Sequence, residues 1–190
     1  MAGHKSTYAE RRAARGEVDD PAVVLEAALR FLEARARSEA EVRRRLTTAG
    51  YRSELVDGAI VRLTELGVLD DEAFARAWVE SRDRARPRGE RALRRELSLK
   101  GVEREVLDEV LEDRRDAAGE DGVDVDLEAA RRLLARNARS LDRVTDPRAR
   151  RQRAYALLAR NGFDPDVCRE ASAGVFSEAD GDGDVQVPVE

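Results

Sequence analysis

The side chains that could form a catalytic pair in this sequence are its only cysteine, Cys168, and its only histidine, His4. Covalent catalysis requires a nucleophile and its base to lie within hydrogen-bonding distance of each other. His4 belongs to a polar N-terminal stretch, whereas Cys168 falls where two other segments of the chain carry Val56 and Leu107. That position predicts a small core residue rather than a reactive thiol, so we expect no nucleophilic site.

Acidic clusters could supply a second kind of chemistry, metal binding. The acidic triplet at 70–72 opens a predicted helix, where carboxylates cap backbone N–H groups and complement the helix dipole. The acidic run at 180–184 resembles the start of a calcium loop, but Val185 replaces the glycine and the twelfth position would fall beyond Glu190. No glycine-rich phosphate loop is present. We therefore predict no metal, no cofactor and no enzyme activity.

Arginine is the charged residue that gathers most strongly in this chain. Seven of the residues at 81–97 are arginines, although the whole chain has a formal net charge of -5. The net charge is +5 over 82–100 and +7 over 131–153, against -5 over 113–128 and -7 over 164–190. Because charge is segregated in this way, the local blocks tell more about partners than the overall charge does.

The composition favours helices over sheets. Hydrophobic residues make up 42% of the chain, aromatic residues only 4% and charged residues 39%. Most apolar residues are Ala, Leu and Val, which suit helices with narrow apolar stripes and predict an all-α protein. The single cysteine fits the reducing cytoplasm. No segment has the apolar length of a membrane span or of a signal peptide, so we expect a cytoplasmic protein without membrane contact.

Three glycines mark a repeated unit. Each of Gly50, Gly101 and Gly162 ends a predicted helix and precedes an apolar residue, as in Schellman-type helix ends. Apolar residues recur eight and four residues before each glycine, and one and five residues after it. They are Val42, Leu46, Tyr51 and Leu55, then Leu93, Leu97, Val102 and Val106, then Ala154, Leu158, Phe163 and Val167. This recurrence predicts three tandem three-helix modules that form an elongated, curved body.

Module boundaries follow from the predicted helix starts and from the composition between them. Asp20 before Pro21 is typical of a helix start, and Ser38 with Glu41 has the pattern of a capping box. The predicted segments are a mobile N-terminal arm at 1–19, modules at 20–69 and 70–116, an acidic linker at 117–125, a third module at 126–173 and a disordered acidic tail at 174–190.

The second helix of each module carries arginines on its outer side. In the middle module Leu93 and Leu97 face inward, which turns the arginines at 91, 94 and 95 toward the sides and the outer face. If the modules stack, these helices lie side by side and form a basic stripe suited to phosphates or carboxylates. The candidate contact residues are Arg82, Arg84, Arg86, Arg88, Arg91, Arg94, Arg95, Lys100, Arg43, Arg44, Arg148 and Arg151. A solvated face with internal ion pairs is the alternative interpretation.

Residues 66–102 resemble the central signature of the RecX family of recombination regulators. That signature has a leucine and paired acids before a Phe-Ala helix, an arginine-rich stretch with glycine, and an apolar helix end. The matching residues are Leu69, Asp70, Asp71, Phe74, Ala75, Arg88, Gly89, Glu96, Leu97, Lys100 and Gly101, with Trp78 among the predicted core positions. The resemblance covers about residues 22–171 and is strongest over 38–112. Val68 and Ala73 depart from the family pattern.

The resemblance implies a regulator of the RecA recombinase. Family members bind the RecA filament on single-stranded DNA and restrain RecA's activities, so RecA becomes the expected partner and the arginines at 91, 94 and 95 the expected centre of the contact. We also expect a monomer with at most weak direct binding to DNA. Two other classes stay open: a helical nucleic-acid-binding protein that acts directly on DNA, and a helical scaffold for an unrelated acidic protein.

Overall fold

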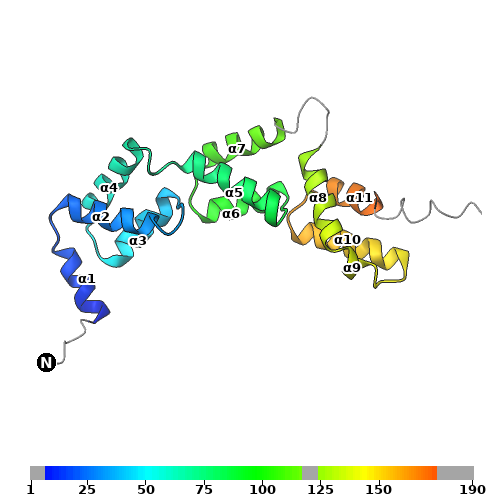
Figure 1. The fold of residues 1–190 in the computed structure, drawn as a ribbon, viewed down its shortest axis with the longest axis horizontal. Helices are drawn as coiled ribbons and strands as arrows, with labels where there is room; N and C mark the ends of the chain where they lie inside the picture. Colours follow the sequence, from blue (N-terminus) through cyan, green and yellow to red (C-terminus); the bar gives the residue numbers. More distant parts are fainter. Residues whose placement is uncertain (1–6, 117–123, 175–190) are drawn as a thin grey trace, which may run out of the picture. The chain divides into compact units, whose positions relative to one another are not determined.

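The computed structural model describes residues 7–116 and 124–174. Within these residues the chain forms eleven helices and no strand (Figure 1), which confirms the all-helical prediction. The chain folds as two compact units. The first comprises the described residues up to Ala77 with Leu97–Leu107, and the second comprises Trp78–Glu96 with the described residues from Asp108 on. His4, most of the predicted linker and nearly all of the predicted tail lie outside the described residues.

The first unit contains three helices packed around one core: α2 (Pro21–Leu32), α3 (Glu39–Ala49) and α4 (Ser53–Glu65). Both predicted helix starts are confirmed. The Asp20 carboxylate accepts a hydrogen bond from the backbone N–H of the second residue of α2, and Ser38 and Glu41 form a capping box at the start of α3. The core residues are Val24, Ala28, Val42, Leu46, Val56, Ala59, Ile60, Leu63 and Leu69.

The middle of the chain forms α5 (Asp71–Ala85), α6 (Glu90–Leu99) and α7 (Arg104–Asp116). Each has an apolar stripe of buried residues at helical spacing. They are Phe74, Ala75 and Val79 in α5, Ala92, Leu93 and Leu97 in α6, and Leu107, Val110 and Leu111 in α7. Helix α6 begins at Glu90, three residues after Pro87.

The second unit ends in α8 (Val125–Arg136), α9 (Ala138–Leu141), α10 (Pro147–Arg160) and α11 (Pro165–Gly174). These helices enclose a core that includes Leu134, Leu158 and Cys168, and the prediction that Cys168 is a core residue is confirmed. One local prediction differs from the structure, because Asp124, assigned to the linker, is the N-cap of α8. The short helix α9 separates α8 from α10.

The three glycines end their helices in the same way. Gly50, Gly101 and Gly162 have φ of 108°, 82° and 83°, a backbone conformation that L side chains rarely adopt. The residue after each glycine donates its N–H to the carbonyl four residues before that glycine. These bonds run from Tyr51 to Leu46 (3.3 Å), from Val102 to Leu97 (3.2 Å) and from Phe163 to Leu158 (3.3 Å). They are the bonds of a Schellman motif, as predicted.

One of the predicted core positions needs a correction. Leu55 and Val106, five residues after their glycines, are only partly buried, whereas the next residues, Val56 and Leu107, are fully buried. The inward face of the third helix in these two modules is therefore centred one residue later than the sequence pattern predicts.

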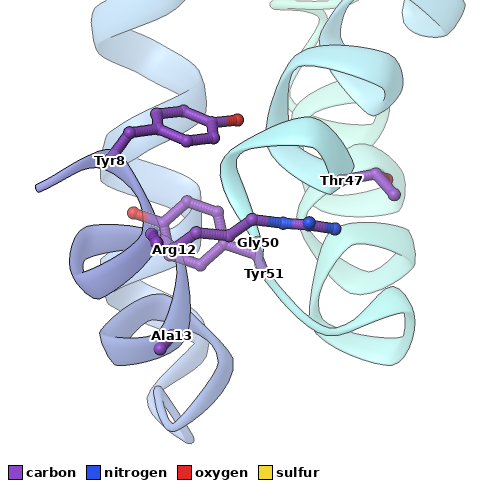
Figure 2. A pocket seen from close by; sticks show the side chains of 7 residues that line it. Tyr8, Arg12, Ala13, Thr47, Gly50 and Tyr51 are labelled. Carbon is purple, nitrogen blue, oxygen red and sulfur yellow. The ribbon is translucent and has the colours of Figure 1, made fainter.

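Residues 8–16, which lie within the predicted mobile arm, form helix α1 (Tyr8–Gly16). Thr7 and Glu10 form a capping box that starts the helix. The helix is polar and none of its residues is buried, so it has no apolar period that sequence analysis could detect. Tyr8 and Arg12 approach Gly50 and Tyr51 at the end of α3 (Figure 2).

Helix α1 covers the end of α3 in the way that modules cover one another. The carbonyl immediately before each of the three glycines accepts a hydrogen bond from a segment earlier in the chain. The donors and acceptors are Arg15 Nη1 and Ala49 O (3.4 Å), Ser38 Oγ and Lys100 O (2.5 Å), and Gly89 N and Asn161 O (3.1 Å). Helix α1 therefore takes the place of the second helix of a preceding module, which is how terminal helices cap repeat proteins.

Candidate functional site

Helix α6 exposes arginines on one side because leucines hold its other side in the core. Leu93 and Leu97 are fully buried, as predicted. Arg91 and Arg95, one helical turn apart, are exposed, and Arg94 is half-buried. The structure thus places the predicted contact residues of α6 in two different environments, exposed for Arg91 and Arg95 and half-buried for Arg94.

Arg94 is held inside its own module. Its guanidinium pairs with Asp108 of α7 and donates to Glu90 at 3.2 Å. The hydrogen bond with Asp108 raises the pKa of Arg94 above its ordinary value, and the bond with Glu90 adds to this. Arg43 of α3 makes the equivalent pair with Asp57 of α4. In both modules the arginine stands seven residues before the glycine and the aspartate seven residues after it.

The next residue in each of these helices is exposed. Arg44 follows Arg43 and Arg95 follows Arg94. Among the described residues neither the Arg44 nor the Arg95 side chain has an ion-pair or hydrogen-bond partner. These two equivalent guanidiniums are therefore available to an external anion, whereas their neighbours are bound within the fold.

Glu96 organises the arginines that precede α6. Its carboxylate accepts hydrogen bonds from Arg82 at 2.7 Å and from the indole of Trp78 at 2.9 Å. The Arg82 guanidinium also lies 4.4 Å from the centre of the Trp78 ring. Arg88 lies 3.5 Å from the same carboxylate and donates to the side chain of Asn161. Arg82 and Arg88 thus have a structural role in the second unit.

The remaining arginines of the cluster are on the surface. Arg84 pairs with Glu80 on the same helix, and both side chains are largely exposed. Arg91 pairs with Asp164 at 2.6 Å. Such exposed pairs contribute little to stability and can exchange for a partner's carboxylate or phosphate. Arg86 is exposed, and its side chain has no hydrogen-bond or ion-pair partner among the described residues.

Lys100 lies at a joint between the first two modules. Its ammonium is 3.4 Å from Glu41, and both side chains are only 16% exposed. The ammonium also lies 5.6 Å from the centre of the Phe74 ring. Burial alone would raise the pKa of Glu41, but the hydrogen bond from Arg35 and the charge of Lys100 outweigh it and lower that pKa. Lys100, one of the predicted contact residues, therefore has mainly a structural role in the first unit.

Asp71 joins the same two modules. Its carboxylate accepts a hydrogen bond from the backbone N–H of Glu39, the first residue of α3, at 2.8 Å. Asp70 alone caps α5, through the N–H of Ala73 at 2.8 Å. The prediction that both acids cap α5 is therefore wrong for Asp71. Burial raises the pKa of Asp71 above its ordinary value, and the nearby charge of Glu39 raises it further, while the hydrogen bond from Glu39 N opposes the shift.

Asp126 makes the equivalent joint in the second unit. It accepts from the N–H of Glu90, the first residue of α6, at 3.0 Å. Arg114, only 7% exposed, binds Asp126 at 2.7 Å and Asp83 at 2.9 Å. Burial opposes the charge on Arg114, but the hydrogen bonds with Asp83 and Asp126 outweigh it and raise its pKa. Sequence reasoning missed this joint, because Asp126 lies 36 residues after Glu90 in the chain.

In the third module Arg148 and Arg151 lie on α10. They line a surface hollow together with Gln152 and Tyr155 of the same helix and with Arg169 and Ser172 of α11. The ring of Tyr155 takes part in this hollow.

The described residues contain no group of three or more His, Cys, Asp or Glu side chains that could hold a metal ion. The Cys168 thiol is buried, and burial raises its pKa, with the charge of Asp164 adding to the shift. A thiol in this state is a poor nucleophile. None of the described helices is long and apolar enough to cross a membrane.

Three family models match successive parts of the chain. They are the first RecX three-helix domain over residues 25–63, the second over 70–111 and the third over 124–171. These matches confirm the prediction of three tandem three-helix modules. The crystal structure of RecX from Lactobacillus salivarius has a TM-score of 0.69 over 83% of this chain and 97% of that one, at 20% identity. At this identity the likeness supports the fold.

Sequence relatives agree with the family models. Regulatory protein RecX of Mycolicibacterium vanbaalenii is 37% identical over 142 residues, covering 71% of this chain and 72% of the relative. Regulatory protein RecX of Mycobacterium marinum is 35% identical over 155 residues, covering 80% of this chain and 84% of the relative. On these matches, the chain belongs to the RecX family.

Proposed function

We propose that this chain binds the RecA nucleoprotein filament on single-stranded DNA and regulates RecA, mainly by inhibiting it. Its relatives are named regulatory proteins, and the RecX resemblance implies RecA as the partner. Under this proposal the chain restrains the recombinase, ATPase and coprotease activities of RecA in DNA repair, recombination and the SOS response. It acts in the cytoplasm as a monomer and has no enzymatic activity of its own.

The observation that supports this proposal most directly is the pair of exposed arginines Arg44 and Arg95. They occupy equivalent positions in two modules, and neither side chain has an internal partner among the described residues. A filament repeats the same surface at each subunit, so a protein with repeated modules can offer the same guanidinium to successive subunits. Guanidinium groups bind carboxylates and phosphates in bidentate fashion, which suits an acidic protein surface.

The other arginines differ in how directly they would contribute to binding under this proposal. Arg86, Arg84 and Arg91 lie at the surface and can add to the contact. Arg43 and Arg94 orient their neighbours by holding the aspartates of the third helices. Arg82, Arg88 and Lys100 hold the modules in shape, and we expect their substitution to disturb the fold before it disturbs binding.

The proposal is tested by titrating the DNA-stimulated ATP hydrolysis of RecA with this protein, beside a binding curve on the same DNA without RecA. Substoichiometric inhibition together with weak binding to bare DNA is the expected result. Tight binding to bare DNA without inhibition would instead identify a protein that acts directly on DNA.

A further inference from the structure

Helix α1 covers the end of α3 with a different kind of side chain from the one that covers the end of α6. A Cβ placed at Gly101 would lie 2.3 Å from the methyl group of Ala40. A Cβ placed at Gly50 would instead lie 2.6 Å from Cγ of Arg12. A long charged side chain therefore crosses the first glycine, where the next module uses a methyl group.

This cover leaves an open hollow of about 690 Å³ between α1 and the end of α3, a size common among sites for small ligands. The rings of Tyr8 and Tyr51 line it together with Arg12, and Figure 2 shows the Arg12 side chain directed toward α3. The described residues that line the hollow include no carboxylate. Arg12 is exposed, and its side chain has no ion-pair or hydrogen-bond partner among the described residues. Its guanidinium is therefore available to an external anion.

Contacts with the fold hold both rings in place. The Tyr8 hydroxyl donates to the carbonyl of Thr48 at 3.1 Å, while Tyr8 as a whole stays 58% exposed. Tyr51 is partly buried against the core of the first module, and the guanidinium of Arg15 lies 5.9 Å from the centre of its ring. Rings held in this way lose little conformational freedom when a flat ligand stacks on them.

We propose that this hollow binds a nucleotide, with the base stacked on the rings of Tyr8 and Tyr51 and the phosphate on Arg12. Guanidinium groups bind phosphate oxygens in bidentate fashion, and aromatic rings stack on unpaired bases. An acidic peptide would engage the guanidinium but leave both rings without a role. A duplex keeps its bases stacked inside, so the ligand is either a free nucleotide or one nucleotide of a single strand.

A ligand in this hollow would also fasten α1 to the first module. None of the residues of α1 is buried, and its hydrogen bonds to the end of α3 include a long one, from Arg15 to the carbonyl of Ala49 at 3.4 Å. A ligand that contacts both helices stabilises the closed arrangement, so it should slow the local opening of α1. Binding elsewhere on the protein would not have this effect.

Two probes distinguish the sources of the nucleotide. Neither requires RecA, so this inference goes beyond the proposed function and does not rest on it. ATP is titrated by calorimetry, and a fluorescein-labelled oligo-dA of about 15 nucleotides by fluorescence anisotropy. Binding of ATP that depends on Arg12 would support the proposal with a free nucleotide as ligand, and binding of the oligonucleotide alone would support it with a single strand. Binding of neither probe would overturn it.

The role of the guanidinium is tested by Arg12→Ala. This variant should bind about tenfold more weakly or worse, since hydrogen bonds between charged groups contribute that much. For the oligonucleotide, the slope of log K against log salt should fall by about 0.7, the contribution of one phosphate on a single strand. The matched control is Arg45→Ala, which removes an exposed charge of α3 outside the hollow and should stay within about twofold of the unmodified protein. Equal losses in the two variants would show that only overall charge matters, and the proposal would be wrong.

The role of the rings is tested by two substitutions of Tyr8, a residue whose replacement leaves the core intact. Tyr8→Ala should bind at least about fivefold more weakly because a stacking surface is lost, whereas Tyr8→Phe keeps the ring and should stay within about twofold. Tripolyphosphate has the charge of ATP without a base. If it competed with the bound probe as well as ATP does, the rings would have no role and the proposal would be overturned.

Hydrogen exchange followed by mass spectrometry locates the ligand without any substitution. At a probe concentration ten times Kd, exchange of the backbone amides of residues 8–16 should slow by about tenfold, because the opened helix offers no complete site. Unchanged exchange in α1 while the probe is bound would place the ligand elsewhere and contradict the proposal.

The two proposals fail separately. If the unmodified protein inhibits RecA but Arg12→Ala binds both probes unchanged, the hollow is not a nucleotide site and the regulatory proposal stands. If binding of a probe depends on Arg12 and Tyr8 but RecA is not inhibited, the nucleotide site stands and the regulatory proposal is wrong.

Discussion

The hydroxyl of Ser38 links two modules by a hydrogen bond to the carbonyl of Lys100, with 2.5 Å between Oγ and O. The same oxygen accepts the N–H of Glu41 at 3.2 Å, so one fully buried side chain caps α3 and closes the end of α6. The contact between the first two modules therefore depends on a small number of polar groups, and the contribution of each group can be tested by substitution.

Substituting Ser38 with alanine should destabilise the first unit by about 2 kcal/mol, because the variant loses a helix cap and leaves a buried carbonyl without its donor. Urea unfolding followed by circular dichroism measures the change. Thr7→Ala removes the equivalent cap from α1, where no residue is buried, and should cost less than about 0.5 kcal/mol in global stability. Equal losses in the two variants would argue against the joint.

Gly101→Ala should be more damaging than the same change at Gly67. Both glycines have positive φ, of 82° and 66°, so both variants incur about 1 kcal/mol of backbone strain. A Cβ at Gly101 would lie 2.3 Å from the Cβ of Ala40, whereas nothing lies within 4 Å of a Cβ at Gly67. Overpacking adds about 2 kcal/mol at Gly101. Thermal unfolding of the two variants that showed the same loss would contradict close packing between the modules.

The stability of the first unit should change with pH through Asp71. Burial raises its folded pKa above the ordinary value of 3.8, so the folded state binds this proton more tightly than the unfolded state. Its contribution to stability is therefore fully present below pH 3.8 and is lost as pH rises through the folded pKa. Asp71→Asn keeps an acceptor for Glu39 N and removes this titration.

The measurement for Asp71 is the free energy of unfolding of both proteins between about pH 3.5 and pH 7. The stability of the Asn variant relative to the original should rise as pH increases across that range. A difference that stays constant, or that falls with rising pH, would show that the folded pKa of Asp71 is not raised.

The structural features that were predicted correctly from sequence alone are those that depend on residues close together in the chain. The apolar positions of Leu93 and Leu97, the left-handed Gly101 and the capping box at Ser38 each depend on residues within one or two helical turns. The joints between modules were missed because their partners are distant in sequence: Asp71 meets Glu39 across 32 residues. Helix α1 was missed because its contacts are polar and its residues exposed.

Prediction of the basic surface was limited in the same way, because it could not take account of partners distant in sequence. Their types and spacing predicted a basic surface, but not which of them are already occupied. Arg94 and Arg95 are neighbours in sequence, yet Arg94 is bound by Asp108 while Arg95 is exposed. That difference depends on the position of α7, which the sequence pattern of α6 does not contain.

The central claim is that the exposed arginines contact the RecA filament, and binding to RecA filaments assembled on immobilised single-stranded DNA with a non-hydrolysable nucleotide tests it most directly. Three proteins are compared: the unmodified chain, Arg44→Ala/Arg95→Ala, and the control Arg132→Ala/Arg139→Ala. Close charge pairs at a protein interface contribute about 1.5 kcal/mol or more, which is roughly tenfold or more in affinity. The account predicts at least about tenfold weaker filament binding for Arg44→Ala/Arg95→Ala, with a weaker salt dependence and unchanged helicity, and no change for the control. Unchanged filament binding by Arg44→Ala/Arg95→Ala, or the same loss in the control, would contradict it.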